Sequence, residues 1–154
     1  MMSIILMLLT SCVSLNPRSE DLSGGRQKYE QKYVVGKDTV KAFGDAAFQI
    51  FEISDDDYAL IMLPDNAAIE RDIIEYREVG ELLYIYGRTG YTIIDLDTNH
   101  IRQYQIFEGY TEDEATYRYR QETRYVEEGI IEIVQDFESF SEEEQAVFEE
   151  LLQE

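Results

Sequence analysis

One short pattern occurs twice in this chain, with an offset of 33 residues. In each copy a tyrosine is followed by an isoleucine, a leucine and an asparagine at the same spacing. The two copies are Tyr58, Ile61, Leu63, Asn66 and Tyr91, Ile94, Leu96, Asn99. Each copy follows a run of aromatic and aliphatic residues, which favour strands. A repeated strand–turn–strand unit restricts the chain to mainly antiparallel β-structure, so we expect two related hairpin units.

Turn residues divide the rest of the chain into further short runs. Aromatic and β-branched residues predict strands at 48–54, 58–63, 72–79, 81–87, 90–96, 100–107 and 129–134. A mixed run at 28–36 is a candidate first edge strand. The segment 72–79 also fits a helical face through Ile69, Ile73 and Tyr76, but the repeated arrangement favours a strand there. We expect a single antiparallel meander of about six or seven strands.

Two capping boxes predict helices near the C-terminus. Thr111 to Glu114 has the spacing of the first, which predicts a helix from about Glu112 to Arg124. A strand over 116–125 remains a competing interpretation. Ser141 to Glu144 forms the second box, and its three glutamates suit a helix N-terminus. This helix would bury Val147, Phe148, Leu151 and Leu152 and expose an acidic face, which makes the fold class α+β.

The first residues of the chain have the composition of a secretory signal. No charged residue occurs before Arg18, and the apolar centre from Ile4 to Leu9 is far shorter than the roughly 20 residues that span a bilayer. It ends at Leu9-Thr10-Ser11-Cys12, which contains the only cysteine. This stretch resembles the lipobox of bacterial lipoproteins, although the segment is short and lacks an early Lys or Arg.

The resemblance implies an anchored protein. Residues 1–11 would be a signal peptide, Cys12 would carry the lipid, and residues 12–27 would form a flexible tether to a single domain at 28–154. The protein would then sit in the bacterial envelope, on the extracytoplasmic side of a membrane. Val13 stands where such lipoproteins commonly carry an inner-membrane retention Asp, so the outer membrane is expected if the host has one.

The charge is strongly negative and unevenly distributed. There are 13 Lys and Arg against 33 Asp and Glu, a net charge of −20. Residues 18–41 hold six basic and four acidic residues, whereas residues 127–154 hold eleven acidic and no basic residues. Binding to nucleic acid is disfavoured, because phosphates require clustered cations. A cationic protein partner fits this charge, and simple solubility is the competing explanation.

Candidates for catalysis or metal binding are few. His100 is the only histidine and lies beside a turn, so we expect a surface residue and no catalytic triad. Asp95, Asp97 and Asn99 imitate the start of a calcium loop but lack its sixth-position glycine and twelfth-position carboxylate, which makes them weak metal candidates. We therefore expect no catalytic residue and no cofactor.

The twelve tyrosines and one arginine-rich segment are the remaining unusual features. Tyr84, Tyr86, Tyr91 and Tyr104 are expected to be strand residues with one ring face in the core. The cluster from Tyr117 to Tyr125 contains Arg118, Arg120 and Arg124. We expect it to dock on the acidic C-terminal helix, and an anionic ligand is the alternative.

These features predict a non-catalytic envelope lipoprotein that acts by binding. An immunity or inhibitor protein directed against a basic partner would fit, with Glu142, Glu143, Glu144, Glu149 and Glu150 as its contact residues. The alternatives are a metal-dependent or carboxylate-based enzyme module and a structural subunit of an envelope complex. The oligomeric state stays open.

Overall fold

The computed structural model describes residues 33–55, 57–106, 111–113 and 123–153. The expected lipobox, Cys12 and the tether at 12–27 lie outside these residues, as do residues 28–32 of the candidate first strand. Residues 114–122 of the first expected helix, with Tyr117, Arg118 and Arg120, lie outside them too. Within the described residues, no helix has the length and apolar character needed to cross a membrane.

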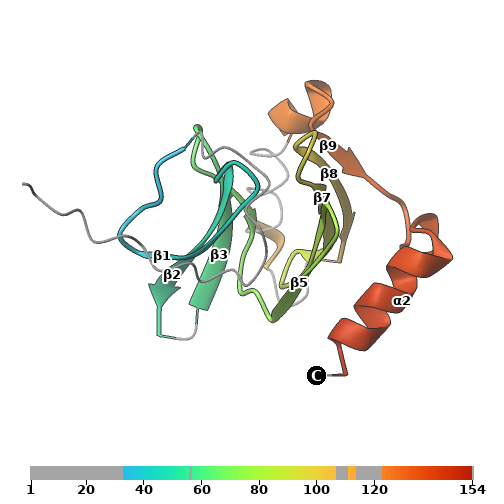
Figure 1. Ribbon diagram of the computed structural model, residues 1–154. Coiled ribbons are helices and arrows are strands. Elements are labelled where there is room, and N and C mark those ends of the chain that lie inside the picture. Colours follow the sequence, from blue (N-terminus) through green and yellow to red (C-terminus); the bar gives the residue numbers. More distant parts are fainter. Residues whose placement is uncertain (1–32, 56, 107–110, 114–122, 154) are drawn as a thin grey trace, which may run out of the picture.

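The described strands form two sheets, and a helix makes a third layer beside the second sheet (Figure 1). The first sheet is an antiparallel meander of β1 (Thr39–Phe43), β2 (Phe48–Ser54), β3 (Asp57–Met62) and β4 (Ala67–Glu70). The second contains β5 (Glu75–Val79), β6 (Leu82–Tyr86), β7 (Gly90–Asp95), β8 (His100–Gln105) and β9 (Ile131–Ile133). Strands β5 to β8 are antiparallel, and β9 pairs parallel to β8. The short helix η1 (Phe137–Ser139) and α2 (Glu142–Leu151) follow.

This architecture confirms a mainly antiparallel β fold with C-terminal helices, and it adds strands to those expected. The described residues contain nine strands in two sheets, where the sequence predicts six or seven in one meander. The division falls between β4 and β5, where Asp72 has a left-handed backbone with φ of 45°. Residues 33–36 are not a strand, and the first strand begins only at Thr39.

Parts of the first expected helix are also present. Glu112, Asp113 and residues 123–127 are helical. The competing strand interpretation of 116–125 is therefore wrong for residues 123–125. Gly129 ends this helix with φ of 71°, a conformation that glycine adopts without a steric penalty.

The repeated pattern corresponds to a repeated structure. Strands β3 and β7 begin 33 residues apart, and each is followed by a four-residue turn that ends in an asparagine. Asn66 and Asn99 both have left-handed backbones, with φ of 55° and 59°. Leu63 and Leu96 make similar hydrogen bonds, since their N–H groups donate to the carbonyls of Ala47 and Glu81, the residues just before β2 and just before β6, at 2.8 and 2.9 Å. The two hairpin units thus share a similar local structure.

The two units stack in the same orientation. Leu60 of the first unit faces the second sheet, whereas its equivalent Ile93, 33 residues later, faces away from the first sheet toward α2. Ile94, next to Ile93, points the opposite way into the core between the sheets. Helix α2 covers Ile93 on this outer face of the second sheet.

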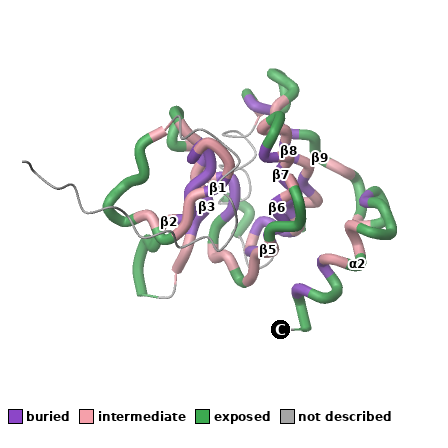
Figure 2. The backbone as a smooth tube through the Cα atoms, in the orientation of Figure 1, coloured by how far each residue is buried: buried purple, intermediate pink, exposed green. Residues whose placement is uncertain are grey.

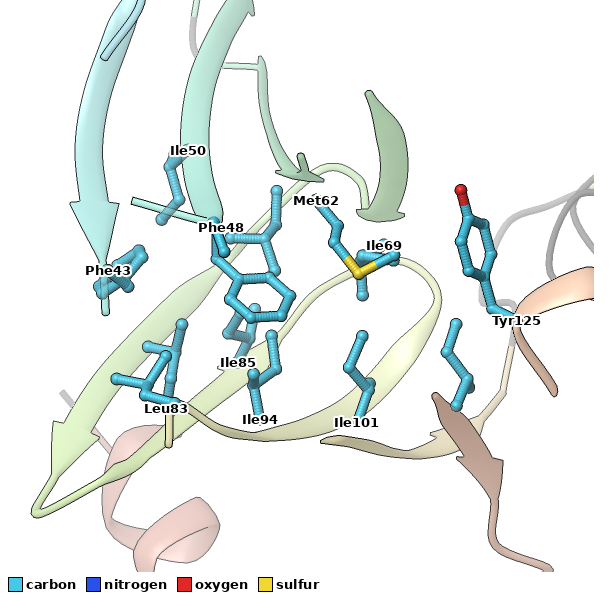
Figure 3. Close-up of a cluster of buried hydrophobic side chains, with 14 residues drawn as sticks. Phe43, Phe48, Ile50, Met62, Ile69, Leu83, Ile85, Ile94, Ile101 and Tyr125 are labelled. Atoms are coloured by element: carbon cyan, nitrogen blue, oxygen red, sulfur yellow. The ribbon is translucent and has the colours of Figure 1, made fainter. Parts of the chain in front are cut away.

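The main core lies between the two sheets (Figure 3). Phe43, Phe48, Ile50 and Leu60 extend from the first sheet, and the second sheet presents the side chains facing them. That opposing set consists of Leu83, Ile85, Ile94, Ile101 and Ile131. All of these side chains are buried. At about 25 cal/mol per Å² of buried apolar surface, this layer is the dominant favourable term in folding.

A buried polar network joins the two sheets at one edge of this core. Glu70 on β4 is fully buried and accepts hydrogen bonds from the N–H of Thr89 at 2.7 Å and the hydroxyl of Thr92 at 3.2 Å. Gln103 donates to the Thr92 hydroxyl at 2.9 Å and to the Ile69 carbonyl at 3.2 Å. Because buried polar groups are costly when unpaired, these bonds fix the position of β4 against the second sheet.

Candidate functional site

Helix α2 begins with the predicted capping box. The hydroxyl of Ser141 accepts a hydrogen bond from the N–H of Glu144 at 3.2 Å, and the Glu144 carboxylate accepts one from the N–H of Ser141 at 2.9 Å. Glu142, Glu143 and Glu144 form the first turn, where the partial positive charge of the helix N-terminus stabilises carboxylates. The acidic sequence is therefore compatible with a stable helix.

An aromatic layer fixes α2 to the outer face of the second sheet. Phe148 is fully buried and makes an edge-on contact with Tyr84 of β6, with ring centroids 5.3 Å apart. It also contacts Tyr91 of β7 at 5.1 Å and Phe140 at 5.6 Å. Leu151 is buried in the same layer. The strand tyrosines thus have a ring in a core, as predicted, but this core is the second one, beneath α2.

Two arginines on the second sheet bind carboxylates of α2. Arg102 of β8 donates from Nη1 to Oε2 of Glu144 at 3.1 Å and from Nη2 to Oε1. Arg77 of β5 donates from Nη1 to Oε2 of Glu150 at 3.1 Å. Burial alone would raise the pKa of Glu144, but the hydrogen bonds from Arg102 and Ser141 leave that pKa below its ordinary value. Burial and the nearby Glu144 carboxylate raise the pKa of Tyr84.

The five glutamates predicted to contact a partner therefore differ in their surroundings. The Glu144 side chain is only 13% exposed and is bound by Arg102. Glu150 is exposed and paired with Arg77. Glu142, Glu143 and Glu149 are exposed, and no side-chain hydrogen bond or ion pair is found for them among the described residues. Leu152, which was predicted to be buried, is 47% exposed.

The acidic surface continues beyond α2. From residue 125 to residue 153 the chain runs past the top of the second sheet, along β9 and into α2 (Figure 1). Every charged residue in this stretch is acidic. The exposed members outside α2 are Glu127, Glu128, Glu132, Asp136 and Glu138, and Figure 2 shows exposed segments alternating with buried ones along this path. We call the path from Glu127 to Glu149 the acidic stripe.

The arginine-rich segment does not dock on α2 where the structure describes it. Arg124 lies 3.4 Å from Oδ2 of Asp65 and donates from Nε to Oε1 of Glu128 at 2.9 Å. The hydroxyl of Tyr125 donates to the same Asp65 oxygen at 3.1 Å. The expected contact with the acidic helix is therefore wrong for these two residues. Their acidic partners lie in the β3–β4 turn and at the end of their own helix.

A groove lies where the two repeated turns meet the segment after this helix. It has a volume of about 410 Å³ and is lined by Leu63, Pro64 and Asp65 of one turn and Thr98, Asn99 and His100 of the other. Tyr125, Glu128 and Ile130 complete it. A second hollow of about 280 Å³ lies on the other side of Asp65 and Tyr125. Sequence reasoning missed this site, because its walls come from segments about 30 residues apart.

The weak calcium candidates form a turn. Oδ1 of Asp95 accepts hydrogen bonds from the N–H groups of Asp97 at 2.9 Å and Thr98 at 3.1 Å. This arrangement is an Asx turn, in which an aspartate side chain closes the backbone before the left-handed Asn99. Among the described residues, no group of three or more His, Cys, Asp or Glu side chains is placed to hold a metal ion.

His100 lies at the start of β8, directly after this turn. Its side chain is 40% exposed, and Nε2 lies 4.0 Å from a carboxylate oxygen of Glu132 on β9. This is the surface position that the sequence predicts. It also places the only histidine of the chain on the wall of the groove.

Comparison of the chain with protein-family models, curated proteins and solved structures finds no match.

Proposed function

We propose that this chain is a non-catalytic, lipid-anchored envelope protein that binds a basic protein partner through the acidic stripe. One observation carries the proposal. Helix α2 is fixed to the sheet by its aromatic face, while Glu142, Glu143 and Glu149 are exposed on it and form no ion pair with the described residues. An immunity or inhibitor role toward a cationic toxin or hydrolase would use such a surface.

The charge arrangement around α2 supports this proposal. Two arginines approach the helix, but they bind Glu144 and Glu150, and the side chains of Glu142, Glu143 and Glu149 face solvent. A rigid negative surface attracts a basic partner before contact and accelerates association. Because the helix is already fixed, binding would not require the ordering of a flexible acidic tail.

The anchor in this proposal rests on the sequence. Cys12 in the lipobox-like stretch would carry the lipid. The segment 18–41, with six basic and four acidic residues, has a net charge of +2. Such a segment tolerates anionic headgroups, whereas the acidic stripe is repelled by them. The domain would then present its acidic side away from the membrane.

A capture experiment from host envelope extract tests the proposal. The bait is the full chain, and the comparison is the variant Glu142→Gln/Glu143→Gln/Glu149→Gln. This variant is preferable to removing α2, since a deletion would expose Tyr84 and the rest of the aromatic layer. The control is Glu52→Gln/Asp55→Gln/Glu75→Gln, which removes three charges elsewhere.

We expect the unmodified chain and the control to retain a basic protein at low salt, and the α2 variant to lose it. High salt should release the retained protein. Equal retention by all three baits, or retention that resists salt, would contradict the proposal. Retention through apolar contacts would then favour a structural subunit of an envelope complex.

A further inference from the structure

The groove between the two repeated turns combines an apolar floor with a negative rim. Met62, Leu63 and Ile130 supply the floor. Asp65 and Glu128 stand at the rim, with side chains 39% and 44% exposed. Aliphatic walls beneath carboxylates match the side chain of arginine or lysine, which has an apolar stem and a cationic end. Glu128 belongs both to the groove and to the acidic stripe, so the two adjoin.

Arg124 of this chain already places a guanidinium group at the rim. Arg124 lies between the two rim carboxylates, 3.4 Å from Oδ2 of Asp65 and 2.9 Å from Oε1 of Glu128. Its guanidinium is 5.6 Å from the centre of the Tyr125 ring, within the range of a cation–π contact. The rim carboxylates and this ring therefore already form a receptor for a guanidinium group.

Arg124 is held weakly enough to be replaced. Its side chain is 64% exposed, and exposed ion pairs contribute little to stability because water screens them. By contrast, the groove wall is fixed by the helix end. The N–H groups of Glu128, Gly129 and Ile130 all bond back to helical carbonyls, and the N–H of Ile101 bonds to the carbonyl of Ile130. An exposed arginine beside a hydrogen-bonded wall can leave without disturbing the site.

We infer that this groove binds an arginine or lysine side chain from a basic peptide segment, and that Arg124 occupies the two carboxylates until that side chain displaces it. The inference rests on the proposed function and adds a second, specific contact for the same partner. The acidic stripe supplies long-range attraction, and the groove supplies a short-range fit for one cationic residue.

The test uses the peptide acetyl-Leu-Arg-Leu-amide and NMR spectroscopy of the full chain. His100 is the only histidine, so its imidazole C–H gives one assignable signal on the groove wall, and the Gly129 amide gives a second. We expect both signals to shift saturably with the arginine peptide. Acetyl-Leu-Gln-Leu-amide, which lacks the charge, should leave both signals in place.

Substitutions around the groove are predicted to change the affinity for the peptide in opposite directions. Asp65→Asn and Glu128→Gln should each weaken peptide binding about threefold or more, as loss of one partly exposed ion pair would. Arg124→Gln should strengthen binding by a similar factor, because it removes the internal competitor. Lys37→Gln is the matched control, since Lys37 is exposed in the loop before β1 and its removal changes the net charge equally. It should leave the affinity unchanged.

Several results would overturn the inference: no saturable shift, equal shifts with the glutamine peptide, or weaker binding to Arg124→Gln. An equal gain with Lys37→Gln would also overturn it, because net charge alone would then explain the effect. The variant Glu142→Gln/Glu143→Gln/Glu149→Gln separates this inference from the proposed function. It should keep peptide binding in the groove even if the capture experiment fails.

Discussion

The guanidinium of Arg102 on β8 donates two hydrogen bonds to the carboxylate of Glu144 on α2, 42 residues further along the chain. Glu144 at the same time closes the capping box with Ser141. One carboxylate therefore fixes both where the helix begins and how it sits on the sheet. This contact orients the exposed glutamates on which the proposed function depends.

The first prediction concerns this contact. Arg102→Ala leaves the mostly buried Glu144 carboxylate without its cation, so the free energy of unfolding should fall by about 2 kcal/mol. Arg77→Ala removes the more exposed pair with Glu150 and should cost less than about 1 kcal/mol. Urea denaturation measures both. Equal losses in the free energy of unfolding would mean that the Arg102–Glu144 contact fixes α2 no more firmly than the Arg77–Glu150 pair.

The pH dependence of stability gives a second test of the Arg102–Glu144 contact. The pKa of Glu144 is lowered in the folded state, so the folded protein binds the Glu144 proton less readily than the unfolded chain. Its stabilising contribution is present above the unfolded pKa and is lost as the pH falls through the folded pKa. Glu144→Gln should therefore lose more stability at neutral pH than at acid pH. A pH-independent loss would contradict this assignment.

The contribution of Asp57 to stability should have the opposite pH dependence. A hydrogen bond with Asp72, burial and the charge of Asp72 all raise the pKa of Asp57. The folded state holds the Asp57 proton more tightly, so this carboxyl favours folding at acid pH, and the benefit disappears as the pH rises through the folded pKa. Asp57→Asn should be more stable than the unmodified protein at pH 7, with a smaller difference at acid pH. Urea denaturation at both pH values checks the sign.

The aromatic layer should dominate the attachment of α2. Phe148→Ala removes a fully buried ring that contacts Tyr84 and Tyr91 and should cost about 3–5 kcal/mol. Leu152→Ala, one turn later and 47% exposed, should cost only a few tenths of a kcal/mol. Thermal or urea denaturation compares the two. A small cost at Phe148 would show that α2 contributes little to the folded domain.

The anchor is tested at Cys12. With a fatty acid that carries a click-chemistry handle, the unmodified chain should become labelled and remain with the membrane fraction. Cys12→Ser should lose both properties, since it removes the thiol that the lipid would occupy. Labelling that persists in Cys12→Ser would contradict lipidation at Cys12. The binding proposal would then concern a domain without this anchor.

The sequence predicted those parts of the fold that depend on local patterns. The offset between Tyr58 and Tyr91 indicated the repeated hairpin, and Ser141 with Glu144 indicated the start of α2. Strand β2 was predicted with its observed bounds, Phe48–Ser54. These features depend on alternation, turn residues and capping, which neighbouring residues determine.

The stacking of the two units could not be predicted in the same way. Leu60 and Ile93 occupy equivalent positions and look alike in sequence, but one faces a sheet and the other faces a helix. Likewise, Arg102 pairs with Glu144 and Arg124 with Asp65, which lie far from these arginines in the sequence. The groove at Asp65 and His100 was missed for this reason, since only the folded chain brings the two turns together.

The most direct measurement of the central claim is the association rate constant between the full chain and the basic protein that it captures. Stopped-flow mixing over a range of salt concentrations would compare the unmodified chain with Glu142→Gln/Glu143→Gln/Glu149→Gln. The account predicts fast association that slows steeply with salt, and a slower, less salt-dependent rate for the variant. Identical rates and salt dependences for the two proteins would contradict it.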